Sequence, residues 1–76
     1  MKRSRSAREI FATNLRRERL AKNWSQMELA EASGLHFTYV SSVECAKRNV
    51  SIDAMERIAV ALDLPLSRLL LDLKDA

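Results

Sequence analysis

Three small hydroxyl residues and two basic residues stand close together in the middle of the sequence. Thr38 is followed by Ser41 and Ser42, at spacings of three and four residues. On a helix these three side chains share one face. That face is slim and offers hydrogen-bond donors and acceptors, and Lys47 and Arg48 add positive charge directly after it. The pattern predicts recognition of a polar, negatively charged partner.

Catalysis is not favoured by any set of residues in the sequence. Paired carboxylates, a metal-ligand cluster and a nucleophile beside a base are all missing. The single histidine, His36, has no second ligand in sight. The single cysteine, Cys45, excludes an internal disulfide and is compatible with a reducing cytoplasm. We therefore predict a cytoplasmic protein that is not an enzyme and needs no cofactor or metal.

Length and charge point to one small domain with a positive end. The chain has 76 residues, and its single Gly and single Pro argue against a many-turned β-fold. Residues 1–24 carry eight Lys/Arg and two Glu, whereas residues 25–76 carry five Lys/Arg and eight acids. This asymmetry suggests either a polyanion as partner or a solubilising face with a disordered tail. The longest apolar run, residues 58–62, is too short to span a membrane.

The elements that must position these side chains are predicted to be helices. Residues 1–6 are expected to form a mobile basic arm. A first helix is expected over residues 7–22, with Phe11, Leu15 and Arg19 along its packed seam. An arginine on that seam is costly unless an acid meets it.

A second helix is predicted from a capping box. Ser25 and Glu28 have the Ser-x-x-Glu spacing, and Trp24 and Leu29 flank the cap as a hydrophobic staple. Gly34 is expected to end this helix in the left-handed conformation.

The next segment, GLHFTYVSSVE, is ambiguous when it is read alone. Leu35, Phe37 and Tyr39 alternate with polar residues, as in a strand. No other segment shows sustained alternation with which such a strand would pair. A helix from about His36 separates a packed face from the small hydroxyls, so a helix is predicted.

Two further helices complete the predicted set. Ser51 caps the fourth and Pro65 begins the fifth. The expected apolar stripes are Ile52, Met55, Ile58, Ala59 and Leu62 in the fourth, and Leu66, Leu69, Leu70 and Leu73 in the fifth. Val60 and Leu71 fall outside these stripes, so they are either scattered surface residues or part of a homodimer interface.

Two segments, WSQMELAEASGLHFTYVSSVE and AMERIAVALDLPLSRLL, resemble the λ-repressor-like (XRE) helix-turn-helix family over about residues 11–70. The family motif is matched by Ser25, Gln26, Leu29, Ala30, Ser33 and Gly34. Within this region, GLHFTYVSSVECAKRNVS is similar to the controller proteins of restriction–modification systems. The resemblance implies an all-α, five-helix DNA-binding domain over residues 7–76, with C-terminal helices that dimerise.

The resemblance also implies roles for the matching residues. Base reading is implied for Phe37, Thr38 and Ser42, with Ser41 beside them. A phosphate contact is implied for Gln26. Lys47, Arg48 and Asn49 are implied to meet phosphate or to reach toward the adjacent groove edge. Arg19 and Glu44 match a buried ion pair that ties the first helix to the third. Tyr39 is expected either to place its hydroxyl on a phosphate or only to pack.

The implied function is that of a bacterial transcriptional regulator. It would bind a pseudo-palindromic double-stranded operator as a homodimer, with RNA polymerase as a further partner. Alternatives are a phage or plasmid repressor, and an antitoxin whose main partner is a toxin protein.

Two departures from the controller pattern concern the third helix. Controllers usually carry Arg where this chain has Phe37, and Arg-Gly where it has Cys45 and Ala46. Phe37 either meets a thymine methyl or a flexible base step, or packs against the neighbouring helix. Without the glycine, the third helix is expected to end differently or to continue slightly.

Overall fold

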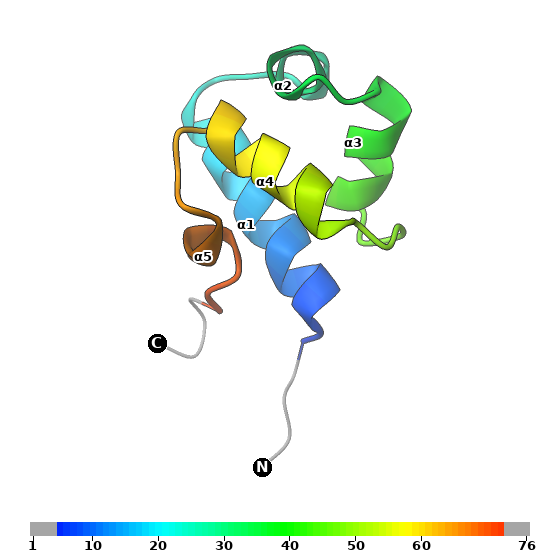
Figure 1. Ribbon diagram of the computed structural model, residues 1–76, viewed down its shortest axis with the longest axis vertical. Coiled ribbons are helices and arrows are strands. Elements are labelled where there is room, and N and C mark those ends of the chain that lie inside the picture. Colours follow the sequence, from blue (N-terminus) through cyan, green and yellow to red (C-terminus); the bar gives the residue numbers. More distant parts are fainter. Residues whose placement is uncertain (1–4, 73–76) are drawn as a thin grey trace.

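The computed structural model describes residues 5–72. This part of the chain contains five helices joined by loops, and it contains no strand. They are α1 (Ala7–Ala21), α2 (Gln26–Ser33), α3 (Phe37–Glu44), α4 (Ile52–Ala61) and α5 (Leu66–Leu69) (Figure 1). The predicted all-α, five-helix fold is confirmed, including the helix in the ambiguous segment. No helix of the described residues is long and apolar enough to cross a membrane.

Serine caps fix where three of the helices begin. Ser25 and Glu28 form the predicted capping box at α2, and the Ser51 side chain accepts the Ala54 N–H at the start of α4. A second capping box, which we did not predict, joins Ser6 and Glu9 at α1. These local hydrogen bonds satisfy backbone donors that would otherwise lack partners.

The first helix begins at Ala7, as predicted, and the two residues before it contact the folded domain. Ser6 caps α1, and Arg5 lies against the domain, with its Nη2 atom 2.5 Å from Asp72 Oδ1 and its Nη1 atom 3.3 Å from Thr13 Oγ1. The contact between Arg5 and Asp72 spans 67 positions, so no pattern of neighbouring residues indicates it. Residues 1–4 of the predicted arm lie outside the described residues.

Each of the first four helices is followed within two positions by a residue with left-handed backbone. The φ angles are 61° at Asn23, 73° at Gly34, 60° at Ala46 and 61° at Asp63. The ending at Gly34 was predicted. Glycine adopts this conformation freely and asparagine or aspartate tolerates it, whereas alanine is strained there.

The end of α3 differs from our expectation. The Ala46 N–H donates to Val43 C=O and the Lys47 N–H donates to Ser42 C=O, both at 3.0 Å. This pair of bonds is the Schellman motif that glycine usually supports. The helix therefore stops at Glu44 as though a glycine followed it, and Ala46 adopts the strained conformation in its place.

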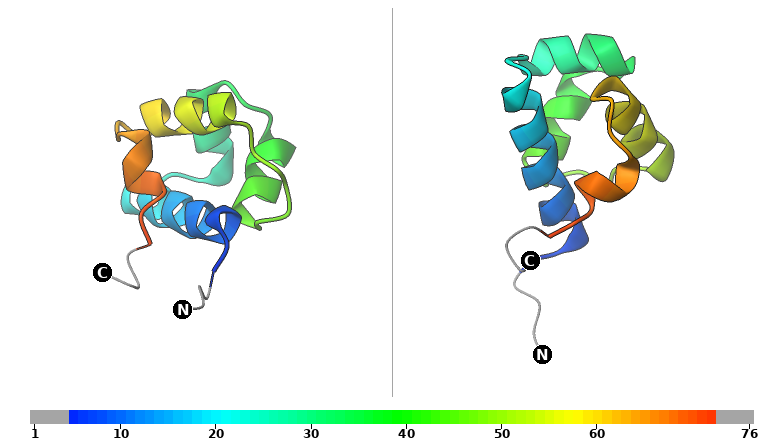
Figure 2. Two further views of the ribbon diagram at one scale, coloured as in Figure 1. Left: turned by 60° about the horizontal axis from the view of Figure 1, so that its bottom comes forward. Right: turned by 90° about the vertical axis from the view of Figure 1, so that its left-hand side faces the viewer.

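The left view of Figure 2 shows the helices arranged around a common centre, and one hydrophobic core of side chains fills the space between them. Helix α1 packs against α3 and α5, and α2 packs against α3 and α4. The centre is filled by apolar side chains that are at least 98% buried, among them Phe11, Leu15, Leu29, Val40 and Ile58. Helix α3 is therefore held on one side by both α1 and α2.

Two of the predicted apolar stripes need correction. Ile52 is 67% exposed, and Ala54 is buried in its place. Helix α5 ends at Leu69, so Leu70 lies beyond it and is 42% exposed. Leu73, also assigned to that stripe, lies outside the described residues.

Candidate nucleic-acid interface

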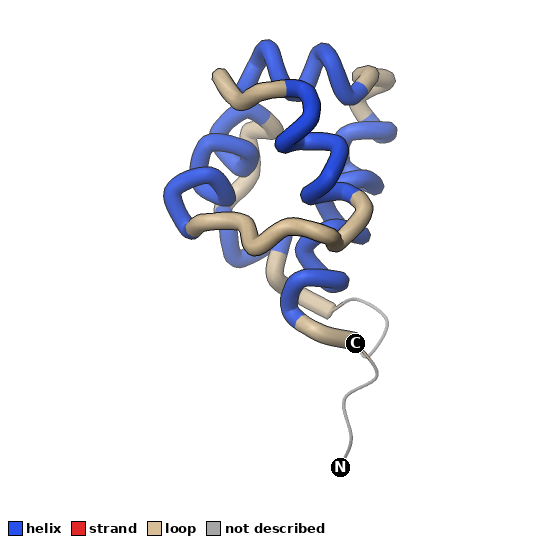
Figure 3. The backbone as a smooth tube through the Cα atoms, turned by 90° about the vertical axis from the view of Figure 1, so that its right-hand side faces the viewer, coloured by secondary structure: helices blue, strands red, loops and turns tan. Residues whose placement is uncertain are grey.

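The three small hydroxyl residues lie on the side of α3 that faces away from the core. Val40 and Val43 bury the opposite side of the helix. Thr38 is exposed, and Ser41 and Ser42 are half-buried; we call these three residues the hydroxyl face. The long tan connection in Figure 3, residues 45–51, follows the helix and carries the basic residues. The packed and polar faces predicted for this helix are confirmed.

Helix α3 is anchored by the carboxylate of Glu44. Arg19 of α1 donates to it twice, from Nε to Oε2 at 2.6 Å and from Nη2 to Oε1 at 3.0 Å. Gln26 of α2 donates its Nε2 N–H to Oε1 at 3.0 Å. Arg19 also donates to the Trp24 carbonyl at 2.6 Å. The carboxylate of Glu44 thus joins α3, which carries the hydroxyl face, to α1 and α2.

The ion pair that the sequence pointed to is present and buried. The side chains of Arg19 and Glu44 are only 8% and 3% exposed. The hydrogen bonds that Arg19 donates to Glu44 raise the pKa of the Arg19 guanidinium, while burial acts in the opposite direction. Gln26 is implied to contact phosphate, and here one of its two amide N–H groups is occupied by Glu44.

The first turn of α3 contains an interaction that sequence analysis missed. His36 is the N-cap of α3, and its Nδ1 atom accepts the backbone N–H of Thr38 at 3.2 Å. The same ring nitrogen lies 2.9 Å from Thr38 Oγ1. The Thr38 hydroxyl is therefore held by the cap of its own helix.

The last turn of α3 is joined to the basic residues that follow it. Ser42 Oγ lies 2.9 Å from the Thr38 carbonyl and 3.0 Å from the Tyr39 carbonyl, and it accepts a hydrogen bond from Arg48 Nε at 3.0 Å. The Arg48 guanidinium lies over the Tyr39 ring, 4.7 Å from its centre. The Tyr39 hydroxyl accepts the Ser51 N–H at 3.4 Å, which leaves the phenolic proton available for a phosphate.

The basic segment lies beside the start of α1. Lys47 and Arg48 are exposed, and Arg8 of α1 donates from Nη2 to Asn49 Oδ1. This contact spans 41 positions, so the sequence did not show it. The contact places the positive charge of Arg8, from the basic residues 1–24, next to the loop that follows α3.

Phe37 occupies the first position of α3 and is 39% exposed. It is absent from the hydrophobic core cluster, which instead includes Leu35 and Tyr39 as partly buried neighbours. The structure therefore leaves much of this aromatic ring accessible at the end of the hydroxyl face.

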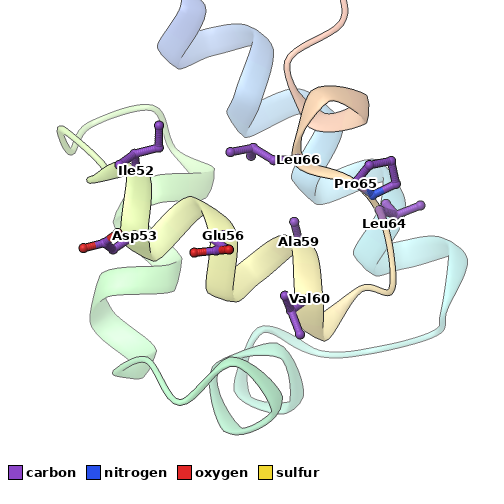
Figure 4. Close-up of a pocket in the computed structure, with 8 residues that line it drawn as sticks. All are labelled: Ile52, Asp53, Glu56, Ala59, Val60, Leu64, Pro65 and Leu66. Atoms are coloured by element: carbon purple, nitrogen blue, oxygen red, sulfur yellow. The ribbon is translucent and has the colours of Figure 1, made fainter.

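The two residues predicted for a dimer interface are both exposed, Val60 by 71% and Leu71 by 50%. Val60 lines a groove of about 470 Å³ between α4 and the chain that enters α5 (Figure 4). Its other apolar lining residues are Ile52, Ala59, Leu64, Pro65 and Leu66, and the acidic residues Asp53 and Glu56 line it as well. Leu71 does not line this groove.

Comparison with known proteins identifies this arrangement. A helix-turn-helix family model matches residues 15–69, which include α2, the turn at Gly34 and α3. The chain belongs to the λ-repressor-like (XRE) helix-turn-helix family. This confirms the family suggested by the sequence motif.

Individual relatives of this helix-turn-helix protein agree with that assignment. It is 46% identical over 63 residues to the control protein C.SmaI of Serratia marcescens, a match that covers 83% of this chain and 75% of the relative. The restriction-modification controller protein C.AhdI of Aeromonas hydrophila is 42% identical, with a TM-score of 0.79 over 82% of this chain and 94% of that one. A hypothetical transcription factor from Neisseria is 37% identical, with a TM-score of 0.90 over 99% and 86% of the two chains.

Proposed function

We propose that this protein is a transcriptional regulator that binds operator DNA and controls a restriction–modification system. The observation that carries the proposal is the hydroxyl face of α3, presented outward on a helix whose other side is fixed by buried side chains and by Glu44. A helix approaches base edges in the major groove only if its outer face is slim. Relatives named as restriction–modification controllers support the biological role.

The proposed contacts divide into base readers and phosphate binders. Phe37 and the hydroxyl face (Thr38, Ser41 and Ser42) read bases. The phosphate binders are Gln26, Tyr39, Lys47, Arg48 and Asn49. Phosphate contacts orient the protein on DNA, and base contacts select the sequence. No catalytic step is assigned to any of these residues.

The proposed active form is a homodimer on a pseudo-palindromic operator in the bacterial cytoplasm. The exposed apolar wall of the α4 groove, with Val60 at its rim, supports a second copy as the partner there. Leu71 is proposed to extend the same interface. Two recognition helices in a dimer should lie about 34–36 Å apart, one turn of DNA. RNA polymerase is the further partner we propose for transcriptional control.

Gel retardation on the DNA upstream of the gene tests the proposal. We expect a retarded complex whose affinity falls linearly on a log–log plot between about 50 mM and about 200 mM salt. Lys47→Ala should reduce that slope by about one, because one phosphate contact is lost.

Lys22→Ala is the matched control, since Lys22 lies at the far end of α1, over the Trp24 ring. This variant should keep the slope of the original protein. If no complex forms at either salt concentration, or if the two lysine variants behave alike, the proposed interface is wrong.

A further inference from the structure

The hydrogen bonds of the Thr38 hydroxyl indicate which kind of base it can read. A hydroxyl has one proton to donate and two lone pairs that accept. Whether Thr38 meets DNA as a donor or as an acceptor depends on where that proton goes. Amino groups at adenine N6 and cytosine N4 are the donors of the major groove, whereas guanine O6 and thymine O4 are acceptors.

The N-cap at His36 determines the position of the Thr38 proton. The Thr38 backbone N–H donates to Nδ1 of His36 at 3.2 Å, and an amide hydrogen cannot rotate away. The ring nitrogen that accepts it carries no hydrogen. At 2.9 Å from Thr38 Oγ1, the same nitrogen can therefore only accept, so the hydroxyl donates its proton to His36.

We propose that His36 acts as a positioning residue that makes Thr38 a hydrogen-bond acceptor toward DNA. Thr38 then accepts a hydrogen bond from the exocyclic amino group, adenine N6 or cytosine N4, of one base pair in each operator half-site. This inference rests on the proposed DNA-binding function, and it adds the hydrogen-bond polarity of one base contact.

Ser42 provides a comparison within the same helix. Its hydroxyl lies within hydrogen-bond distance of the Thr38 and Tyr39 carbonyls, which can only accept, so its proton is also turned inward. This arrangement uses backbone carbonyls of α3 and does not involve His36. The base contact of Ser42 should therefore be independent of the N-cap residue.

The experiment begins with selection of bound duplexes from a randomised pool by the original protein. The same selection is then run with Thr38→Val. The operator position at which the original protein prefers one base pair and this variant does not is the position read by Thr38. At that position, the adenine of a selected A·T pair is replaced by purine, or the cytosine of a selected G·C pair by 2-pyrimidinone. Either replacement removes the amino group of the base pair. We expect the original protein to lose about fivefold in affinity and Thr38→Val to lose less than about twofold.

His36 variants then test the positioning role. In His36→Ala the Thr38 hydroxyl is free to donate, so the loss on removing the amino group should fall below about twofold. In His36→Asn the amide oxygen can accept both hydrogens at the cap, so the fivefold loss should return. Loss of the cap alone would weaken all duplexes alike and would leave the preference between bases unchanged. The preference at the Ser42 position should persist in both variants.

Several results would overturn the inference. One is an unchanged affinity of the original protein when the amino group of the selected base pair at the Thr38 position is removed. Others are a Thr38→Val variant that changes no position, or an undiminished amino preference in folded His36→Ala. If the original protein enriches no sequence at all, the proposed DNA-binding function itself is contradicted.

Discussion

At the scale of single residues, the carboxylate of Glu44 has the greatest structural consequence. It accepts hydrogen bonds from Arg19 and Gln26, so it joins α1, α2 and α3. A buried ion pair adds little net stability compared with apolar residues of the same shape, but a half-removed pair is strongly destabilising. The pair is best understood as setting the orientation of α3 relative to the two helices beneath it.

Replacing Glu44 by Ala should lower the free energy of unfolding by about 3–5 kcal/mol, because the Arg19 charge remains buried without its partner. Urea denaturation followed by circular dichroism measures this change. Glu31→Ala, an exposed position on α2, serves as the control and should change stability by less than about 0.5 kcal/mol. Equal midpoints for the two variants would show that the ion pair does not carry this energy.

Phe37 is the residue at which this protein departs most clearly from the controllers it resembles. Because its ring is 39% exposed and outside the core cluster, Phe37→Ala should leave the thermal midpoint nearly unchanged. The same variant should relax the base preference at one position of each half-site, since an apolar contact with a thymine methyl or a flexible step is lost. Selection from randomised duplexes measures the preference. An unchanged consensus at unchanged affinity would assign Phe37 no role in reading.

At the scale of helices, the end of α3 stores strain at Ala46. The residue adopts a φ angle of 60° so that the Schellman hydrogen bonds can form. Asn23, Gly34 and Asp63 do the same at the other helix ends with residue types that tolerate the left-handed conformation better. The strained position directly precedes Lys47 and Arg48.

Ala46→Gly should raise the free energy of unfolding by about 1 kcal/mol, because glycine removes the steric penalty of the left-handed conformation. Ala32→Gly, at an exposed position inside α2, is the matched control and should lower it by about the same amount. Chemical denaturation of both variants gives the comparison. A destabilised Ala46→Gly protein would mean that the backbone at position 46 is not strained.

The helices were largely predictable because their start signals are local. Ser25 with Glu28, and Ser51, can be recognised from neighbouring residues alone, and the equally spaced Ser6 and Glu9 carried a signal that we overlooked. Where α5 stops could not be predicted, since it depends on packing against α1. Asn14 of α1 donates to the Leu69 and Leu71 carbonyls at the end of that helix.

The candidate site was predictable in its residues but not in its hydrogen bonds. The spacing of Thr38, Ser41 and Ser42 predicts a shared helix face whatever the rest of the fold. The contact between Arg8 and Asn49, and the direction of the bond between His36 and Thr38, depend on three-dimensional geometry. No pattern of residue types along the chain contains that information.

At the scale of the whole molecule, the recognition surface and the proposed dimer surface lie on different helices. The hydroxyl face belongs to α3, whereas Val60, Ile52 and the groove belong to α4 and the connection to α5. Helix α2 packs against both α3 and α4. A substitution in the groove therefore tests the proposed dimer without removing any of the proposed base readers.

Val60→Glu should raise the dimer dissociation constant at least about tenfold, because a charge replaces an apolar contact on both subunits. Sedimentation velocity over a range of protein concentrations measures this constant. Leu20→Glu is the control, since Leu20 is similarly apolar and 50% exposed but belongs to α1. If both variants dimerise as the original protein does, the interface lies elsewhere.

The contact between Arg5 and Asp72 has a consequence for how the chain can be rearranged. It places the first and last described residues side by side, so a short Gly/Ser linker can join Asp72 directly to Arg5. New ends can then be opened at the exposed turn around Asp63, between α4 and α5. Circular permutation is tolerated at such exposed turns when the original ends are close together. The helix-turn-helix would then lie in the interior of the permuted chain, with its order α2 to α3 unchanged.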